Sequence, residues 1–210
     1  MLNKRYYRIF SRGLALFVIV LLGACTASPP KQTDNVCDIF REKKKWYKQA
    51  LKAQEKWGSS IPTMMAFVHQ ESRFVADARP PRKYYLGFIP GPRPSSAYGY
   101  PQAKKETWQY YQRATGNYRD KRDKFADAMM FIGWYNDQTF QRNKVAKNDT
   151  YNLYLAYHEG HGGYARSTYK NKQWLTGVAK KVSSQAWRYK TQLDACEKEV
   201  SKRRRFLGIF

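Results

Sequence analysis

The chain has 210 residues, and its 39 Lys and Arg residues against 16 Asp and Glu residues give it a formal net charge of +23. Such a charge favours polyanionic partners, whether nucleic acid, envelope phosphate or an acidic glycan, although a basic surface can also serve solubility alone. With only three cysteines and three histidines, and no H-E-x-x-H pattern, the sequence predicts no metal centre and indicates no other cofactor.

The N-terminus has the pattern of an export signal. Four basic residues precede an apolar stretch at 14–22, which is short for a membrane span and is followed by small residues. The segment Leu22–Cys25 resembles a bacterial lipobox, which predicts a signal peptide at 1–24 and lipidation of Cys25. Thr26 stands where an inner-membrane retention Asp would stand, so we expect a lipid anchor in the outer membrane, facing the periplasm. An ordinary signal peptide or an uncleaved anchor is the alternative.

Export changes the interpretation of the remaining charge and cysteines. The predicted signal has four basic and no acidic residues, so the mature chain keeps +23 − 4 = +19. Nucleic acid is then no longer an expected partner. Peptidoglycan glycan strands and other anionic polymers of the bacterial cell envelope remain as candidates. Cys37 and Cys196 form an even pair in an oxidising compartment, which predicts a disulfide across almost the whole domain. Two buried free thiols are the alternative.

Helical periodicity dominates the rest of the chain, and the alternation typical of strands is scarce, so we expect a mostly α fold. We divide the chain into a polar tether at 25–36, one domain at 37–199 and a basic, apolar tail at 200–210 that either contacts lipid or a partner or is disordered. The helices predicted are 36–57, 61–73, 102–115, 122–141, 150–158 and 173–199. The aromatic residues expected in the core are Trp108, Tyr111, Phe131, Trp134 and Tyr135.

Two irregular segments interrupt this pattern. Residues 78–96 are rich in proline and glycine, and their aromatic side chains argue against simple disorder. The glycine-rich segment 160–164 directly follows an apolar helix and permits close backbone approach.

Glu71 is the most informative carboxylate, because it ends the apolar helix predicted at 61–73. Such a side chain cannot be fully hydrated, and desolvation raises the pKa of a carboxyl group. Glu71 could therefore hold a proton near neutral pH, as a general acid must. The alternative is a surface residue paired with Arg73.

Three short motifs then follow one another in a specific order. They are Glu71-Ser72, Gly99-Tyr100-Pro101-Gln102 and Ala156-Tyr157-His158-Glu159-Gly160. Over roughly residues 56–169 this order resembles the soluble lytic transglycosylase (SLT) domain, whose motifs are Glu-Ser, Gly-Leu-Met-Gln and Ala-Tyr-Asn-x-Gly. The resemblance implies a goose-type-lysozyme-like helical domain that cleaves peptidoglycan, with the Pro- and aromatic-rich loop as an insertion.

The resemblance also implies a role for each matching residue. Glu71 matches the catalytic acid and base, and Ser72 matches the serine that positions the N-acetyl group or the glycosidic linkage. Gly99 and Gln102 match the ends of the second motif, with Gln102 as a contact to substrate or to the Glu71 region. Tyr157 matches the tyrosine whose hydroxyl lies near the catalytic carboxyl group.

The chain departs from the family pattern in the second and third motifs. Tyr100 and Pro101 replace Leu and Met, and His158 replaces Asn, so the glycan preference stays open. We expect His158 to line the cleft or to hold Glu159. The aromatic residues that we expect to stack on sugar rings in a groove are Tyr84, Tyr85, Tyr98 and Tyr100.

Most glycosidases need a second carboxylate, for which Asp77 and Glu159 are candidates, although ordinary salt bridges would explain both. The resemblance implies instead that Glu71 protonates the bond between N-acetylmuramic acid and N-acetylglucosamine and then takes the proton of the C6 hydroxyl, which closes a 1,6-anhydro ring. The alternatives are a catalytically impaired, peptidoglycan-binding envelope lipoprotein and a lysozyme-type hydrolase.

Overall fold

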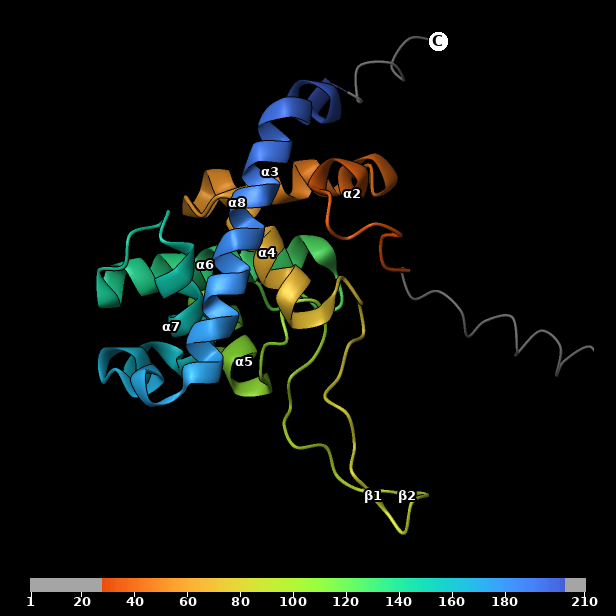
Figure 1. The fold of residues 1–210 in the computed structure, drawn as a ribbon, viewed down its shortest axis with the longest axis vertical. Helices are drawn as coiled ribbons and strands as arrows, with labels where there is room; N and C mark the ends of the chain where they lie inside the picture. Colours follow the sequence, from red (N-terminus) through yellow and green to blue (C-terminus); the bar gives the residue numbers. More distant parts are fainter. Residues whose placement is uncertain (1–27, 203–210) are drawn as a thin grey trace, which may run out of the picture.

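Helix α8 (Gln173–Lys202) runs along the domain, and three other helices account for most of its packing (Figure 1). The computed structural model describes residues 28–202. Apolar residues of α8 recur every three or four positions and form one buried stripe. The stripe consists of Leu175, Ala179, Val182, Ala186, Tyr189, Leu193, Cys196 and Val200. It packs against α2 (Val36–Glu42), α4 (Ile61–Ser72) and α7 (Thr150–Ala165).

Helix α4 crosses the centre of the domain and carries Glu71 in its last turn. The Ser60 hydroxyl accepts a hydrogen bond from the Thr63 amide at 3.4 Å, and Pro62 occupies the first turn, as expected at a helix start. Ten of its 12 residues are buried. Its apolar residues lie on all sides of the helix, so neighbouring elements must pack around it on all sides. The helix ends at Arg73, whose left-handed backbone has φ 50°. The prediction of a helix over 61–73 is confirmed.

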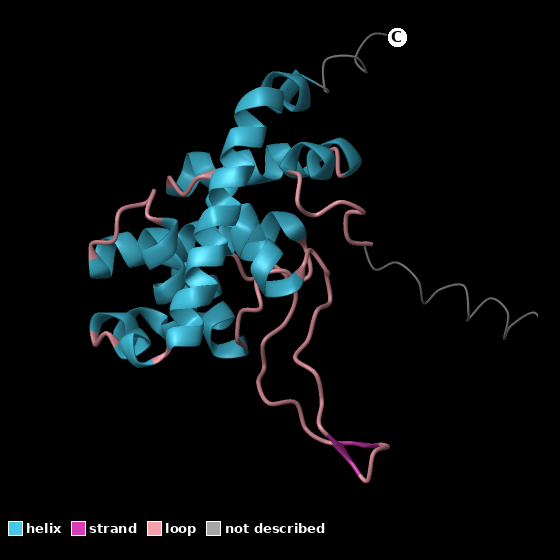
Figure 2. Cartoon of the chain, in the orientation of Figure 1, coloured by secondary structure: helices cyan, strands magenta, loops and turns pink. Residues whose placement is uncertain are grey.

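The remaining helices form a second group that shares the aromatic core. Helix α3 (Trp46–Trp57) packs on α6 (Phe125–Asn143), and α5 (Lys105–Thr115) covers the other end of α6. The aromatic residues predicted for the core on α5 and α6 are all buried. Helices dominate the described chain and strands are few (Figure 2). The mostly α, lysozyme-like fold class is therefore confirmed.

The helices predicted from 102 and 122 begin three residues later, at Lys105 and Phe125, and two other predicted helices differ more from the structure. The helix predicted at 36–57 is divided into α2 and α3 at Lys43–Lys45, because α2 packs on α8 whereas α3 turns away to pack on α6. The helix predicted at 150–158 continues to Ala165, with a kink at Gly160, where φ is 75° and ψ is 156°. A side chain is strained at such a positive φ, so glycine permits the kink. The short η1 (Thr168–Asn171) then leads into α8.

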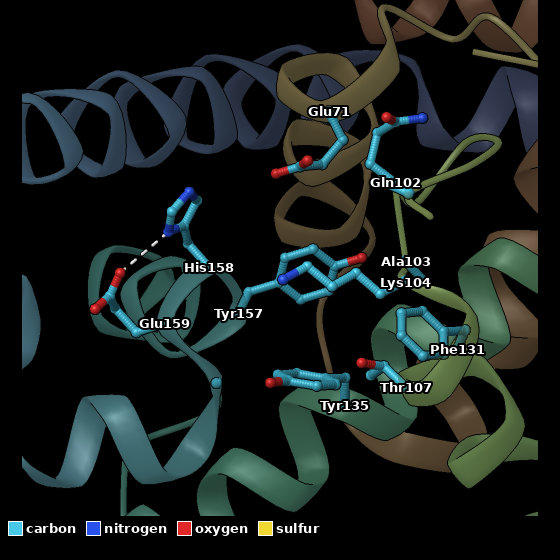
Figure 3. Close-up of a pocket in the computed structure, with 12 residues that line it drawn as sticks. Glu71, Gln102, Ala103, Lys104, Thr107, Phe131, Tyr135, Tyr157, His158 and Glu159 are labelled. Carbon is cyan, nitrogen blue, oxygen red and sulfur yellow. Dashed lines mark hydrogen bonds and ion pairs between the residues drawn. The ribbon is translucent and has the colours of Figure 1, made fainter. Parts of the chain in front are cut away.

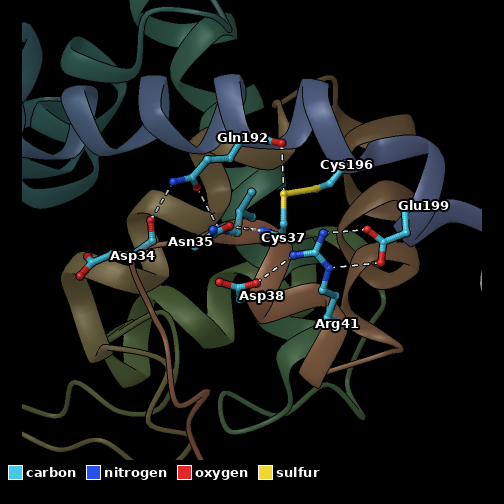
Figure 4. A network of polar contacts seen from close by, with 9 residues as sticks. Asp34, Asn35, Cys37, Asp38, Arg41, Gln192, Cys196 and Glu199 are labelled. Carbon is cyan, nitrogen blue, oxygen red and sulfur yellow. Dashed lines mark hydrogen bonds and ion pairs between the residues drawn. A yellow bond between two sulfur atoms is a disulfide. The ribbon is translucent and has the colours of Figure 1, made fainter.

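The predicted disulfide between Cys37 and Cys196 is present and joins α2 to α8 (Figure 4). It closes a loop with a sequence separation of 159, which in the loop-entropy model stabilises the fold by about 5 kcal/mol. Beside it, Arg41 bonds Glu199 at 2.7 Å. The Gln192 side chain accepts from the Val36 amide at 3.0 Å and donates to the Asp34 carbonyl at 3.2 Å. The described part of the predicted tether is thus fastened to α8.

The Pro- and aromatic-rich insertion is a hairpin that extends away from the helices (Figure 1). Two short antiparallel strands, β1 (Tyr84–Tyr85) and β2 (Ile89–Pro90), form its far end. Tyr84 and Tyr85 are 60% and 57% exposed there. The expectation that these two residues line the groove is wrong, because the hairpin carries them away from the domain.

Several predictions fall on residues outside 28–202. The signal peptide at 1–24, the lipidation site Cys25 and most of the tail at 200–210 are among them. Within 28–202, no helix is both long and apolar enough to cross a bilayer. The same residues contain no group of three or more His, Cys, Asp and Glu side chains that could hold a metal ion.

Candidate active site

Glu71 opens into a pocket of about 390 Å³ between α4, the start of α5, α6 and α7 (Figure 3). A volume of this size suits a small-molecule or sugar-unit site. Helix α7 and its kink form one wall of the pocket, through Tyr157, His158, Glu159 and Gly160. The other residues that line the pocket include Gln102, Lys104, Thr107, Phe131 and Tyr135.

The environment of Glu71 favours its protonated form. Desolvation raises the pKa of its carboxyl group to about 7, and a hydrogen bond from Tyr154 opposes part of that rise. The Tyr154 hydroxyl donates to Glu71 Oε1 at 2.9 Å. Arg73, the alternative partner considered from the sequence, lies instead against the His69 ring, with Nη1 2.5 Å from Nε2. Near neutral pH, Glu71 therefore populates both its acid and its base form.

Tyr157 lies near the Glu71 carboxyl group, as predicted, and the two groups interact electrostatically. It lines the pocket, but its hydroxyl donates to the Pro101 carbonyl at 2.6 Å and not to Glu71. Its ring packs edge-on against Phe67 at 5.1 Å. Tyr154, three residues earlier on the same face of α7, is the tyrosine that reaches the carboxyl group. No motif in the sequence marks Tyr154, although its helical spacing from Tyr157 is a signal that could indicate it.

Gln102 lies beside Glu71 at the pocket wall (Figure 3). Its side-chain Nε2 donates to the carbonyls of Ala78 and Gly99 at 2.9 and 2.8 Å. These bonds fix the amide and leave its oxygen as the group available to a ligand. Gly99 itself is buried and has φ 76°, and a Cβ there would lie 2.2 Å from the Arg122 carbonyl oxygen. Gly99 therefore permits a close backbone approach and does not line the pocket.

Three other predicted substrate-binding residues lie outside the pocket lining. Tyr100 is 1% exposed, because its ring packs edge-on against Trp46 and Phe125 in the core. The Tyr98 hydroxyl donates to Asp123 at 3.2 Å, so its side chain is directed to a separate depression. The Ser72 hydroxyl donates to the Val68 carbonyl at 3.2 Å within α4 and is buried.

The two candidates for a second carboxylate have different surroundings. Asp77 lies in the same separate depression as Tyr98. Glu159 lines the Glu71 pocket, but its side chain is only 4% exposed and Lys172 Nζ bonds it at 2.8 Å. The hydroxyl of Thr168 also donates to it. These two hydrogen bonds lower the pKa of Glu159 to about 2, so it is a fixed anion.

His158 stands at the rim of the pocket, as predicted from its place in the third motif. Its Nδ1 lies 3.2 Å from Glu159, and its ring packs edge-on against Trp174 at 5.1 Å. Trp174 is 59% exposed at the start of α8. No motif in the sequence signalled Trp174, because η1 brings it beside the pocket from a later helix.

Comparison with known proteins gives one match. A model of the family described as "Transglycosylase SLT domain" matches residues 13–196. No curated protein and no solved structure shows a significant match.

Proposed function

The chain belongs to the transglycosylase SLT domain family, and from this premise we propose that it is a peptidoglycan lytic transglycosylase with Glu71 as its catalytic residue. The bond to be cleaved joins C1 of N-acetylmuramic acid to N-acetylglucosamine. The observation that carries the proposal is the environment of Glu71. A pKa of about 7 allows one carboxyl group to donate a proton and then to accept one near neutral pH.

In the first step Glu71 is the acid. Its proton passes to the glycosidic oxygen, the bond from C1 to that oxygen breaks, and the electron pair leaves with the N-acetylglucosamine hydroxyl. The carbonyl of the muramoyl N-acetyl group stabilises the positive charge that develops at C1. The Tyr154 hydroxyl, 2.9 Å from Oε1, stabilises the carboxylate that Glu71 has become.

In the second step Glu71 is the base. Its carboxylate takes the proton from the C6 hydroxyl of the same muramoyl residue, and O6 forms the new bond to C1. This closes the 1,6-anhydro ring and returns Glu71 to its protonated form, with no water consumed. Because the nucleophile belongs to the substrate, a high effective molarity replaces a positioned water.

The pocket supports this route over hydrolysis. Most hydrolytic glycosidases use a second carboxylate, and the other carboxylate in the pocket lining, Glu159, is already bonded to Lys172 and Thr168. We assign substrate contacts to the Gln102 oxygen, His158 and the Tyr157 ring, all of which line the pocket. Ser72 positions the end of α4 and thereby Glu71.

We further propose that the chain acts in the bacterial cell envelope as a lipoprotein anchored through Cys25, facing the periplasm from the outer membrane. The lipobox-like segment and the disulfide support export. The high positive charge supports attraction to peptidoglycan carboxylates and other anionic envelope polymers.

Mass spectrometry of peptidoglycan digests tests the proposal. Purified peptidoglycan is incubated with the full chain, with Glu71→Gln and with Glu55→Gln, which makes the same chemical change at an exposed residue of α3. We expect anhydro-muramoyl ends from the native chain and from Glu55→Gln, and none from Glu71→Gln. Reducing ends would indicate a hydrolase, and an inactive native chain would indicate a peptidoglycan-binding lipoprotein that has lost activity.

A further inference from the structure

The hairpin at 79–96 carries its large apolar side chains at the end that is farthest from the helices (Figures 1 and 2). Leu86 and Phe88 are 82% and 72% exposed, and Ile89 is 45% exposed. Together with Tyr84 and Tyr85 they form a group that we term the hairpin tip, Tyr84–Ile89. Single exposed apolar residues are ordinary in soluble domains, whereas a contiguous group of them marks an interaction surface.

The hairpin is held by its own contacts. The Gly91 amide donates to the Lys83 carbonyl at 2.7 Å, and Arg93 Nη1 donates to the Pro80 carbonyl at 2.5 Å. Residues 81–90 are all exposed, so no part of the helical domain covers this stretch. The tip is thus presented away from the domain by a hydrogen-bonded stem.

The turn at the end of the tip holds an apolar residue at a strained position. Leu86 and Gly87 have φ 50° and 80°. Two successive positive φ values are typical of the tight hairpin turn that favours Asn, Asp or Gly, and a leucine is uncommon there. Solubility and local stability would both favour a different residue at this position, and a contact made by Leu86 would account for it.

The charge near the tip has one sign. Between Asp77 and Glu106 the sequence contains six Lys and Arg residues and no acidic residue. Arg82 and Lys83 directly precede the tip, and both are exposed. An apolar, aromatic end followed by cations is the arrangement by which proteins enter the interface of an anionic bilayer.

We propose that the hairpin tip inserts into the interfacial region of a bilayer that carries anionic headgroups, with Arg82 and Lys83 at the level of those headgroups. A sugar ligand fits less well, because no residue of 79–96 lines the Glu71 pocket. A protein partner fits less well too, because a stable interface buries about 800 Å² on each side, whereas the tip is a narrow turn. A bilayer requires no complementary surface.

The test is a fluorescence measurement on the full chain reconstituted into vesicles. Leu86→Cys carries an environment-sensitive fluorophore, and Cys25→Ser in all samples restricts the label to one site, since Cys37 and Cys196 are paired. The control carries the same label at Tyr118→Cys, a 68% exposed residue after α5. Vesicles contain phosphatidylethanolamine with phosphatidylglycerol, or phosphatidylcholine alone.

We expect blue-shifted emission at position 86 in anionic vesicles, quenching there by nitroxide-labelled lipid, and neither effect at position 118. In the Arg82→Ser/Lys83→Ser variant the ratio of inserted to free tip should fall about 25-fold. Each cation near such a surface raises the binding equilibrium constant about fivefold. Equal insertion into neutral vesicles would overturn the role of the two cations. Solvent-like emission in both lipids would overturn the proposal, and a response to added glycan strands alone would replace it with a sugar contact.

Discussion

Two glutamates line the same pocket and experience opposite environments. Glu71, at the end of α4, has its pKa raised to about 7 by desolvation. Glu159, on α7, has its pKa lowered to about 2 by hydrogen bonds from Lys172 and Thr168. The carboxyl group alone therefore does not define the role of either glutamate. A group that is buried with one neutral donor can exchange a proton, whereas a group that is bonded to a cation remains a structural anion.

The strongest test of this difference is the rate of peptidoglycan cleavage. Glu71→Gln removes the group that transfers the proton, and we expect a loss of about a thousandfold or more, since one positioned acid or base contributes about 10²–10⁴. Glu159→Gln should lower the rate of cleavage by about tenfold at most, because Glu159 acts only through the position of α7. Initial rates on the same glycan preparation check both variants. Equal losses would contradict the assignment of roles.

The effect of Glu71→Gln on stability should depend on pH. A raised pKa means that the folded chain holds this proton more tightly than the unfolded chain, so the contribution of Glu71 to stability is lost as the pH rises from about 4.5 to about 7. At pH 8 we therefore expect Glu71→Gln to increase the free energy of unfolding by about 3 kcal/mol, at 1.36 kcal/mol for each pKa unit. At pH 4 the gain should disappear. Urea unfolding at both pH values gives the answer.

Glu159→Gln should have the opposite pH dependence. The lowered pKa means that the Glu159 contribution is fully present above about pH 4.5 and is lost as the pH falls toward about 2. At pH 7 we expect the free energy of unfolding of the variant to be about 2 kcal/mol lower than that of the native chain, because Lys172 and Thr168 lose a charged partner. Acid unfolding of this variant and of Glu55→Gln separates the effect from a general loss of charge. A cost that persists unchanged to pH 2 would contradict the ion-pair explanation.

The smallest expected effect belongs to the hydrogen bond that Tyr154 donates to Glu71. Tyr154→Phe removes a donor that stabilises the ionised carboxyl group, so the pKa of Glu71 should rise further, by about one unit. Tyr157→Phe is the matched control, because its hydroxyl donates to the Pro101 carbonyl. The pH dependence of cleavage should move to higher pH in the first variant and remain in place in the second.

The features that could be predicted from the sequence depend on local patterns. The apolar run from Ile61 fixes α4 as a buried helix, and that burial is the reason that Glu71 was expected to hold a proton near neutral pH. The pair Cys37 and Cys196 follows from a count of cysteines and the inferred compartment.

The features that could not be predicted depend on how distant segments meet. Tyr154 and Tyr157 share one face of α7, and only the packing of Tyr157 against Phe67 and Pro101 decides which hydroxyl reaches Glu71. The Glu159 anion depends on Lys172, which η1 brings back toward α7. Likewise, the aromatic residues near the second motif were expected in one groove, but Tyr100 is turned into the core.

The most direct test of the role of Glu71 is to titrate its carboxyl group. Infrared difference spectroscopy monitors the titration in the native chain and in Glu71→Gln. We expect one carboxyl group with a midpoint near 7 that is absent from the variant and that shifts upward in Tyr154→Phe. A Glu71 midpoint near the ordinary value of about 4.5 would contradict that role, because a group ionised throughout the neutral range cannot supply the first proton.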